Sequence, residues 1–258
     1  MKTIKIIAPA KINLSLKVGK KRPDGFHPIE SIMQAISLCD YLDIQTKEGM
    51  GHIILDGTSR EIPYDENNIA YKAAKKFMEV SGKNFDVNIY IEKNIPVCAG
   101  LAGGSTDAAG VLFGLNKIHN NILSEVKIFE IAKELGSDLN FCLKGAKQLC
   151  TGKGDEMIPL EFVDFSLTLV KPKNLKISAK EAYERFDNLK EESDLANDLE
   201  FALLPHYKEL RKLHDLNMSM SGSGPTYFIK KHALGFELDD NYQVIENLHA
   251  INHGVCEI

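Results

Sequence analysis

A glycine-rich stretch at residues 96–109 constrains the fold of this chain more than any other feature of its sequence. It reads P-V-C-A-G-L-A-G-G-S-T-D-A-A, with Gly100, Gly103 and Gly104 close together. Before it, residues 85–92 alternate between apolar and polar side chains, as in a half-buried strand. After it, apolar residues recur with helical spacing. The sequence therefore predicts a strand, a glycine-rich loop and the beginning of a helix.

Such a loop is suited to binding a polyphosphate. Glycines let main-chain N–H groups approach an anion because no Cβ atom stands in the way, and the start of a helix adds free donors. We expect Ser105 or Thr106 to be the N-cap of this helix. The loop is not a Walker A motif, since no lysine separates Gly104 from Ser105, and it does not fit G-x-G-x-x-G. These residues alone also allow a simple turn before a helix.

Residues 4–18 alternate between apolar and polar side chains, which predicts two strands broken at Ala8 and Pro9. The alternation places Lys11 and Asn13 on the same face of the second strand. They could point together into a cleft, or they could lie on the solvated face of an edge strand. The sequence of this segment alone allows both.

Residues 96–105 resemble the phosphate loop of the GHMP kinase superfamily, which includes galactokinase, homoserine kinase and mevalonate kinase. Two further stretches agree with this resemblance: P-A-K-I-N-L-S-L at 9–16 with R-P-D-G-F-H-P-I at 22–29, and M-S-G-S-G-P-T at 220–226. The first pair resembles a narrower group, the kinases that act on 4-diphosphocytidyl-2-C-methyl-D-erythritol in the non-mevalonate (MEP) isoprenoid pathway. The third stretch could also be a plain hairpin turn.

The resemblance implies a two-domain α+β fold. The N-terminal domain, residues 1–152, would be similar to domain 2 of ribosomal protein S5 and would bind ATP. The C-terminal domain, residues 153–258, would be ferredoxin-like. ATP and the small-molecule substrate would then meet in the cleft between the two domains.

The resemblance also implies a catalytic pair, Lys11 and Asp138. Asp138 would be the general base for the acceptor hydroxyl, and Lys11 would stabilise charge on the transferring group. The family pattern around the aspartate is G-[AS]-D-[VI]-P-F, whereas this chain has G-S-D-L-N-F, so Asn140 replaces a proline. Taken alone, Asp138 could be an ordinary turn residue. Mg²⁺ is the expected metal, with the Ser105 hydroxyl near it and no carboxylate ligand assigned.

The remaining site residues follow from the same resemblance. The implied ATP-binding residues are Asn68, Pro96, Val97, Cys98, Ala99, Gly100, Leu101, Ala102, Gly103, Gly104, Ser105 and Thr106. The implied substrate-binding residues are Asn13, Phe26, His27, Asp138 and Tyr183. Phe26 and Tyr183 would stack on the two faces of the cytosine ring, with His27 at its edge. The alternatives are that both aromatic residues belong to the core and that Asn68 simply caps the helix predicted to follow it.

Composition limits the other functions that this chain could have. The 258 residues carry a net charge of −5, which argues against general nucleic-acid binding. Five cysteines without a C-x-x-C pair favour reduced thiols. No apolar run is long enough to span a membrane, and the first residues are too interrupted for a signal peptide, so we expect a cytoplasmic enzyme. The oligomeric state is not indicated.

Periodicity and turn residues predict most of the other elements. Helices are expected at 69–80, 125–135, 178–186, from 197, at 210–216 and at 241–250, and strands at 165–170, on both sides of the 220–226 turn and at 255–258. Two alternatives to the narrow kinase group stay open: another GHMP kinase of the homoserine or mevalonate type, and a non-catalytic nucleotide-binding regulator with the same fold.

Overall fold

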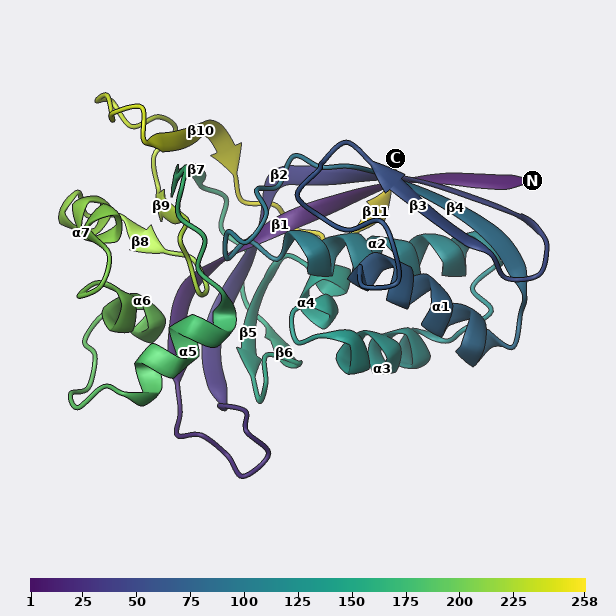
Figure 1. Cartoon of the computed structure of the whole chain (residues 1–258), viewed down its shortest axis with the longest axis horizontal. Helices are drawn as coiled ribbons and strands as arrows, with labels where there is room; N and C mark the ends of the chain where they lie inside the picture. The colour runs from purple at the N-terminus through teal and green to yellow at the C-terminus, as the bar shows by residue number, and fades with distance from the viewer.

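The computed structural model describes all residues 1–258 and has two lobes, each built on its own β-sheet (Figure 1). The larger sheet has the strand order β11-β1-β2-β4-β3, with β5 paired to β2 and β6 paired to β5. Its strands are β1 (Lys2–Val18), β2 (Ile29–Glu48), β3 (Ile53–Gly57), β4 (Phe85–Glu92), β5 (Lys147–Thr151), β6 (Glu156–Pro159) and β11 (Cys256–Glu257).

Four helices cover one face of the larger sheet. They are α1 (Ile69–Ser81), α2 (Gly103–Ile118), α3 (Glu125–Leu135) and α4 (Leu139–Lys144). A core of 28 buried residues fills the space between these helices and the strands. The helices predicted at 69–80 and 125–135 are confirmed, and the first ends at Gly82, whose left-handed φ of +65° suits glycine.

Strand β1 is one continuous strand, so the break predicted at Ala8 and Pro9 is wrong. The pairing of β1 with β2 shifts register between Pro9 and Ala10, and again between Asn13 and Ser15. A proline has no N–H to donate to the sheet, and a register shift lets the strand continue past it. The single long strand runs from the edge of one lobe to the boundary with the other, and Lys11 lies at that boundary.

The smaller sheet has the order β10-β7-β9-β8 and packs against three helices. Its strands are β7 (Ser166–Pro172), β8 (Ser219–Met220), β9 (Tyr227–Ile229) and β10 (Tyr242–His249). The helices are α5 (Ala179–Asp187), α6 (Asp198–Leu203) and α7 (Lys208–Asp215), close to their predicted positions.

The helix predicted at 241–250 is wrong, because this segment is strand β10, paired antiparallel with β7. The register shifts between Ile245 and Leu248, and Asn247 has a φ of +61°. Ile245 and Leu248 therefore both contact the same core although they are three residues apart. That spacing imitates a helix, and a bulge in a strand produces it.

The two lobes share a third core of buried apolar residues. Ala10 and Ile12 of β1 meet Leu167 and Leu169 of β7 there, together with Leu101 of the glycine-rich loop. The boundary predicted at 152/153 falls in the turn between β5 and β6, and β6 still belongs to the larger sheet. The chain passes to the smaller sheet between Pro159 and Ser166 and returns at its end, where β11 pairs with β1.

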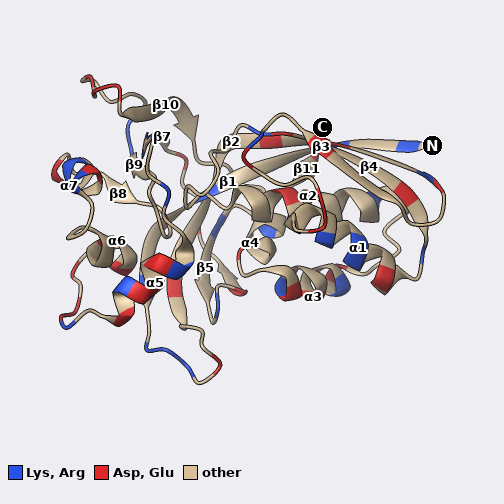
Figure 2. Cartoon of the chain, in the orientation of Figure 1, with Lys and Arg blue, Asp and Glu red and all other residues tan.

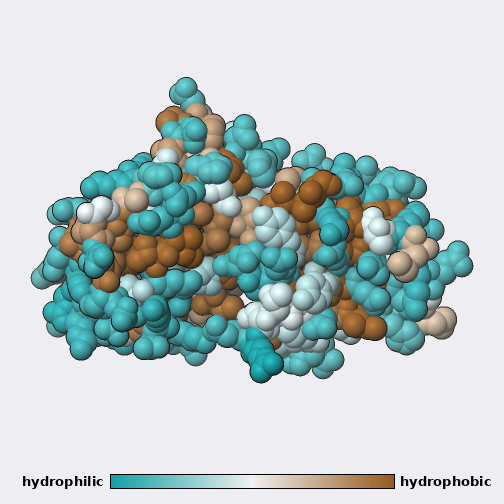
Figure 3. Space-filling model, turned by 90° about the horizontal axis from the view of Figure 1, so that it is seen from above, coloured by the Kyte–Doolittle hydropathy of each residue, from teal (hydrophilic) through white to brown (hydrophobic).

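The surface is mixed in charge and hydropathy. Lys, Arg, Asp and Glu residues occur together on α3 and α5 (Figure 2). From above, polar and apolar side chains both appear on the face of the larger sheet that no helix covers (Figure 3). Exposed apolar residues of its strands include Tyr41, Ile54 and Tyr90. None of the helices has both the length and the apolar character needed to cross a membrane.

The end of α4 is held against the C-terminal segment at Gly145, which yields a prediction about stability. An ideal Cβ at Gly145 would lie 2.0 Å from the main-chain N of Gly254, whereas one at Gly82, with the same φ of +65°, has no neighbour within 4 Å. Gly82→Ala should therefore cost only backbone strain, about 1–2 kcal/mol. Gly145→Ala should cost more than about 3 kcal/mol, because main chain must move.

Unfolding of both variants in guanidinium chloride measures this difference. Equal losses of stability would contradict the close packing of the C-terminal segment on α4.

Candidate active site

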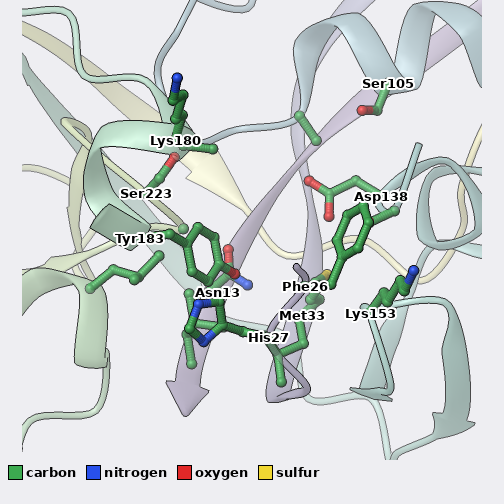
Figure 4. Close-up of a pocket in the computed structure, with 18 of the residues that line it drawn as sticks. Asn13, Phe26, His27, Met33, Ser105, Asp138, Lys153, Lys180, Tyr183 and Ser223 are labelled. Carbon is green, nitrogen blue, oxygen red and sulfur yellow. The ribbon is translucent and has the colours of Figure 1, made fainter. Parts of the chain in front are cut away.

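Two neighbouring pockets are lined by the glycine-rich loop. The larger has a volume of about 570 Å³ and is lined by residues of both lobes (Figure 4). The smaller, about 430 Å³, follows the glycine-rich loop. Gly100, Ala102 and Ser105 line both pockets, so the loop forms the boundary between them.

Helix α2 begins at Gly103, three or four residues before the predicted start. Its N-cap is Ala102, with a left-handed φ of +61° and no side-chain cap, so the expectation that Ser105 or Thr106 caps the helix is wrong. The first α-helical hydrogen bond runs from the Thr106 N–H to the Ala102 carbonyl, at 2.9 Å. The N–H groups of the residues before Thr106 have no hydrogen-bond partner within the helix, and no side chain forms a capping hydrogen bond with them. The loop thus offers uncapped main-chain donors beside both pockets.

Glycine is required at Gly100 for a reason the sequence does not reveal. An ideal Cβ there would lie 2.2 Å from the Ser221 carbonyl oxygen, at a φ of +74°. The Ser221 hydroxyl also donates to the Gly100 carbonyl, at 3.0 Å. The glycine-rich loop therefore touches the second glycine-rich turn, Met220 to Thr226, from the other lobe. At Gly103, by contrast, a Cβ would point toward Ile95 and away from open space.

Lys93, just before the loop, is buried between two carboxylates. Its Nζ forms ion pairs with Asp40 and, at 2.7 Å, with Asp107. Asp40 also accepts hydrogen bonds from the main-chain N–H groups of Asn94, at 2.6 Å, and Ile95, at 2.8 Å, which fixes the entry to the loop. Burial acts to lower the pKa of Lys93, but Asp107 and Asp40 outweigh it and raise that pKa.

Burial raises the pKa of Asp107 well above its usual range; the charge of Lys93 acts against this shift and that of Asp40 adds to it. Asp107 Oδ1 has no hydrogen-bond partner in the protein, and the residue lines the smaller pocket. The sequence pattern does not mark the trio of Lys93, Asp40 and Asp107, because Asp40 is far from the loop along the chain.

Lys11 and Asn13 do point together into the larger pocket, and both are almost fully buried. Lys11 Nζ donates to Asn13 Oδ1 at 2.7 Å, and Asn13 Nδ2 donates to the Ser31 hydroxyl at 2.7 Å. Lys11 Nζ also lies 3.6 Å from Asp138 Oδ2. The structure therefore brings together two residues that are far apart in sequence.

Asp138 is the N-cap residue of α4, yet its side chain makes no capping hydrogen bond. The carboxylate keeps 30% of its side-chain surface exposed and faces the larger pocket. Asn140, which stands where the family has proline, is buried within the first turn of α4. The helix starts at the expected place without the proline.

Asn68 caps helix α1, as the simpler alternative predicted. Its Oδ1 accepts from the Ala70 N–H at 2.9 Å, and its Nδ2 donates to the Pro63 carbonyl at 2.7 Å. Asn68 also lines the smaller pocket beside the loop. Of the predicted site residues, Thr106 alone lines neither pocket, because it is fully buried inside α2.

Tyr183 of α5 lines the larger pocket and stacks on His27, with ring centroids 5.2 Å apart and an interplanar angle of 28°. His27 Nδ1 donates to the Gly19 carbonyl at 2.8 Å, and its Nε2 lies 3.1 Å from Asp187 Oδ1. Burial raises the pKa of Tyr183 to about 12, and the charge of Asp138 adds to this effect. The phenol therefore stays neutral at physiological pH.

Phe26 is 51% exposed, so it is not a core residue. The ammonium of Lys153 lies 3.7 Å from the centroid of its ring, a cation–π contact, and Lys153 Nζ also lies 3.4 Å from Asp24 Oδ2. Lys21 and Lys180 line the same pocket. No motif in the sequence marks these three lysines as site residues.

Comparisons with known proteins agree with this geometry. Residues 68–146 match the family model described as "GHMP kinases N terminal domain". A 4-diphosphocytidyl-2-C-methyl-D-erythritol kinase of Caldicellulosiruptor bescii is 40% identical over 253 residues, which cover 87% of this chain and 88% of that relative.

Solved structures of kinases have the same fold. A 4-(cytidine 5'-diphospho)-2C-methyl-D-erythritol kinase superimposes with a TM-score of 0.78 at 25% identity, over 96% of this chain and 99% of the other. A homoserine kinase from Cytophaga hutchinsonii gives 0.71 at 16% identity, over 100% of this chain and 98% of the other, which shows the fold alone. The predicted two-domain GHMP kinase fold is confirmed. With its identity to the Caldicellulosiruptor enzyme spread over nearly the whole chain, the protein belongs to the 4-diphosphocytidyl-2-C-methyl-D-erythritol kinase family.

Proposed function

We propose that this protein transfers the γ-phosphoryl group of ATP to the 2-hydroxyl of 4-diphosphocytidyl-2-C-methyl-D-erythritol. One observation carries this proposal. The Lys11–Asp138 pair lies in the larger pocket, and the glycine-rich loop that borders this pocket also lines the smaller one. A nucleotide along the loop and an alcohol in the larger pocket would meet beside the pair.

ATP is proposed to lie in the smaller pocket, with its phosphates over the start of α2. The uncapped N–H groups at Gly103 and Gly104 support this placement, because such donors and the helix dipole favour an anion. Mg²⁺ usually keeps phosphate oxygens and waters and takes few protein ligands. The residues present fit that mode, since Ser105 offers a hydroxyl between the pockets and no cluster of three acidic, His or Cys side chains forms a dedicated cage. When bound, Mg²⁺ would neutralise phosphate charge.

Asp138 and Lys11 are proposed to do the chemistry of the acceptor side. Asp138 would accept the proton of the substrate hydroxyl as the O–P bond forms and the bond to the ADP oxygen breaks. Lys11 would stabilise the negative charge on the transferring group. Asn13 orients the Lys11 ammonium through the 2.7 Å hydrogen bond, and Ser31 in turn orients Asn13.

The cytidylyl group is proposed to lie between Phe26 and Tyr183, which are on opposite sides of the pocket in Figure 4. His27 stacks on Tyr183 and its Nε2 lies 3.1 Å from Asp187 Oδ1, and its ring would face the edge of the base. Lys153 lies against the Phe26 ring, where its charge could meet the substrate diphosphate.

The two alternatives fit this pocket less well. A site for homoserine or mevalonate needs neither exposed stacking surface nor several ammonium groups, and this pocket of about 570 Å³ has both. A regulator that only binds nucleotide would not need a buried lysine beside a carboxylate in the larger pocket.

A direct assay tests the function. The protein is incubated with ATP, Mg²⁺ and, separately, the cytidylyl substrate, homoserine or mevalonate, and products are identified by mass spectrometry. A phosphorylated cytidylyl product alone supports the proposal. Phosphorylation of another alcohol, or ATP hydrolysis that no alcohol stimulates, would overturn it.

Replacement of the general base provides a sharper test. Asp138→Asn keeps the shape of the side chain and removes the proton acceptor, so kcat should fall by about 10²- to 10⁴-fold while ADP affinity stays nearly unchanged. Asp215→Asn, which removes an exposed carboxylate in the other lobe, is the matched control. A fall in kcat of less than about tenfold would argue against the general-base role.

The substrate-stacking role predicts a loss of affinity without a loss of stability. Phe26→Ala should weaken binding of the cytidylyl substrate by about 1–3 kcal/mol, as removal of a base-stacking aromatic ring does elsewhere. The melting temperature should not change, because Phe26 is half exposed. Phe236→Ala removes another exposed phenylalanine, 42% exposed and outside the pocket, and should affect neither property. Calorimetric titration and a thermal melt measure both, and unchanged substrate affinity would remove Phe26 from the site.

A further inference from the structure

Lys171 of strand β7 lies on the face of the smaller sheet that meets the glycine-rich loop. Side chains two residues apart share a face of a strand, and Leu167 and Leu169 pack on Ala99 and Leu101 of the loop. Lys171 is the next residue on that face. Both Lys171 and Lys176, which follows β7, are close enough to the loop thiol of Cys98 for it to influence their pKa.

The strand pairing places Lys171 beside the second glycine-rich turn as well. Val170 is opposite Tyr227 in the β7–β9 pair, so the same register puts Lys171 opposite Thr226, the end of that turn. The turn is closed by a hydrogen bond from the Ser221 N–H to the Thr226 carbonyl, at 2.9 Å. Lys171 is therefore next to the junction at which the two glycine-rich segments touch.

Lys171 is only 8% exposed, and no carboxylate is paired with it. Glu61, the acidic group whose charge acts on it, instead forms an ion pair with Lys176 at 2.8 Å. Burial lowers the pKa of Lys171, with Glu61 acting in the opposite direction. A buried ammonium without a counter-ion costs free energy, which an arriving anion would recover.

We infer that Lys171 is a nucleotide-binding residue, contributed by the C-terminal lobe, whose ammonium contacts the phosphate nearest the nucleoside. Lys11 and Asp138 line the larger pocket together with Ser105, and the transferred group would lie beside them. Cys98 lines the smaller pocket and not the larger one, so a cation near Cys98 is placed to meet a part of the nucleotide other than the transferred group. The Lys176–Glu61 ion pair joins the C-terminal lobe to residues before Asn68 on the same side.

This inference rests on the proposed nucleotide site, and binding measurements without the cytidylyl substrate test it separately from the phosphorylation reaction. ADP and adenosine are titrated calorimetrically into the wild-type chain and into Lys171→Met. The variant should bind ADP at least about tenfold more weakly, because a hydrogen bond from a charged donor is lost, while its affinity for adenosine changes less than twofold. Lys171→Arg keeps the charge and should bind ADP better than Lys171→Met.

Lys173→Met is the matched control, because Lys173 is exposed and directly follows the same strand, and this variant should bind ADP as the wild type does. A thermal melt confirms that each variant is folded. ADP binding by folded Lys171→Met within twofold of the wild type overturns the inference, and so does an equal loss for ADP and adenosine, which would indicate a packing effect. If the wild-type chain itself binds no ADP, the proposed function fails and the inference fails with it.

Discussion

The buried ammonium group of Lys11 is the interaction on which the rest of the site depends. Lys11 is 4% exposed and has one close acceptor, Asn13 Oδ1 at 2.7 Å, while Asp138 stays at 3.6 Å. A charge in this position is tolerated only when it is paired and hydrogen-bonded. This arrangement leaves some hydrogen-bond donors of the Lys11 ammonium without an acceptor. Their burial costs free energy in the unliganded protein, and a phosphoryl group that accepts from them would remove this cost. Such stored electrostatic cost is typical of preorganised sites.

The contact between the two lobes also leaves no room for a larger side chain, because main chain packs directly on main chain there. Gly100 has room for a hydrogen atom only, since a Cβ would overlap the Ser221 carbonyl. Ser221 Oγ donates to the Gly100 carbonyl and lies 3.3 Å from the Asn13 N atom, which donates to it. One serine hydroxyl of the C-terminal lobe thus links the glycine-rich loop and strand β1, which contains Lys11.

Local signals in the sequence predicted the parts of this structure that local physics determines. The loop, the cap of α1 at Asn68 and the shared face of Lys11 and Asn13 all follow from spacing and residue type. The helix predicted at 241–250 failed because a bulge gave a strand the spacing of a helix. Contacts across the sheets, such as Lys93 with Asp40, depend on the tertiary fold, and no short window of sequence contains them. The prediction that Lys11 and Asp138 form a pair came from the resemblance to known kinases and not from periodicity.

The exchange of the family proline for Asn140 shows which part of the motif the fold needs. Proline favours the first turn of a helix because it lacks an N–H that would be unsatisfied there. Asn140 is buried in the first turn of α4, and the helix still begins directly after Asp138. Two contacts from outside the turn hold α4: the Val255 N–H donates to the Cys142 carbonyl at 3.0 Å, and Gly145 packs on Gly254. Because tertiary contacts fix α4, Asp138 need not cap its own helix, and its carboxylate is free to face the pocket.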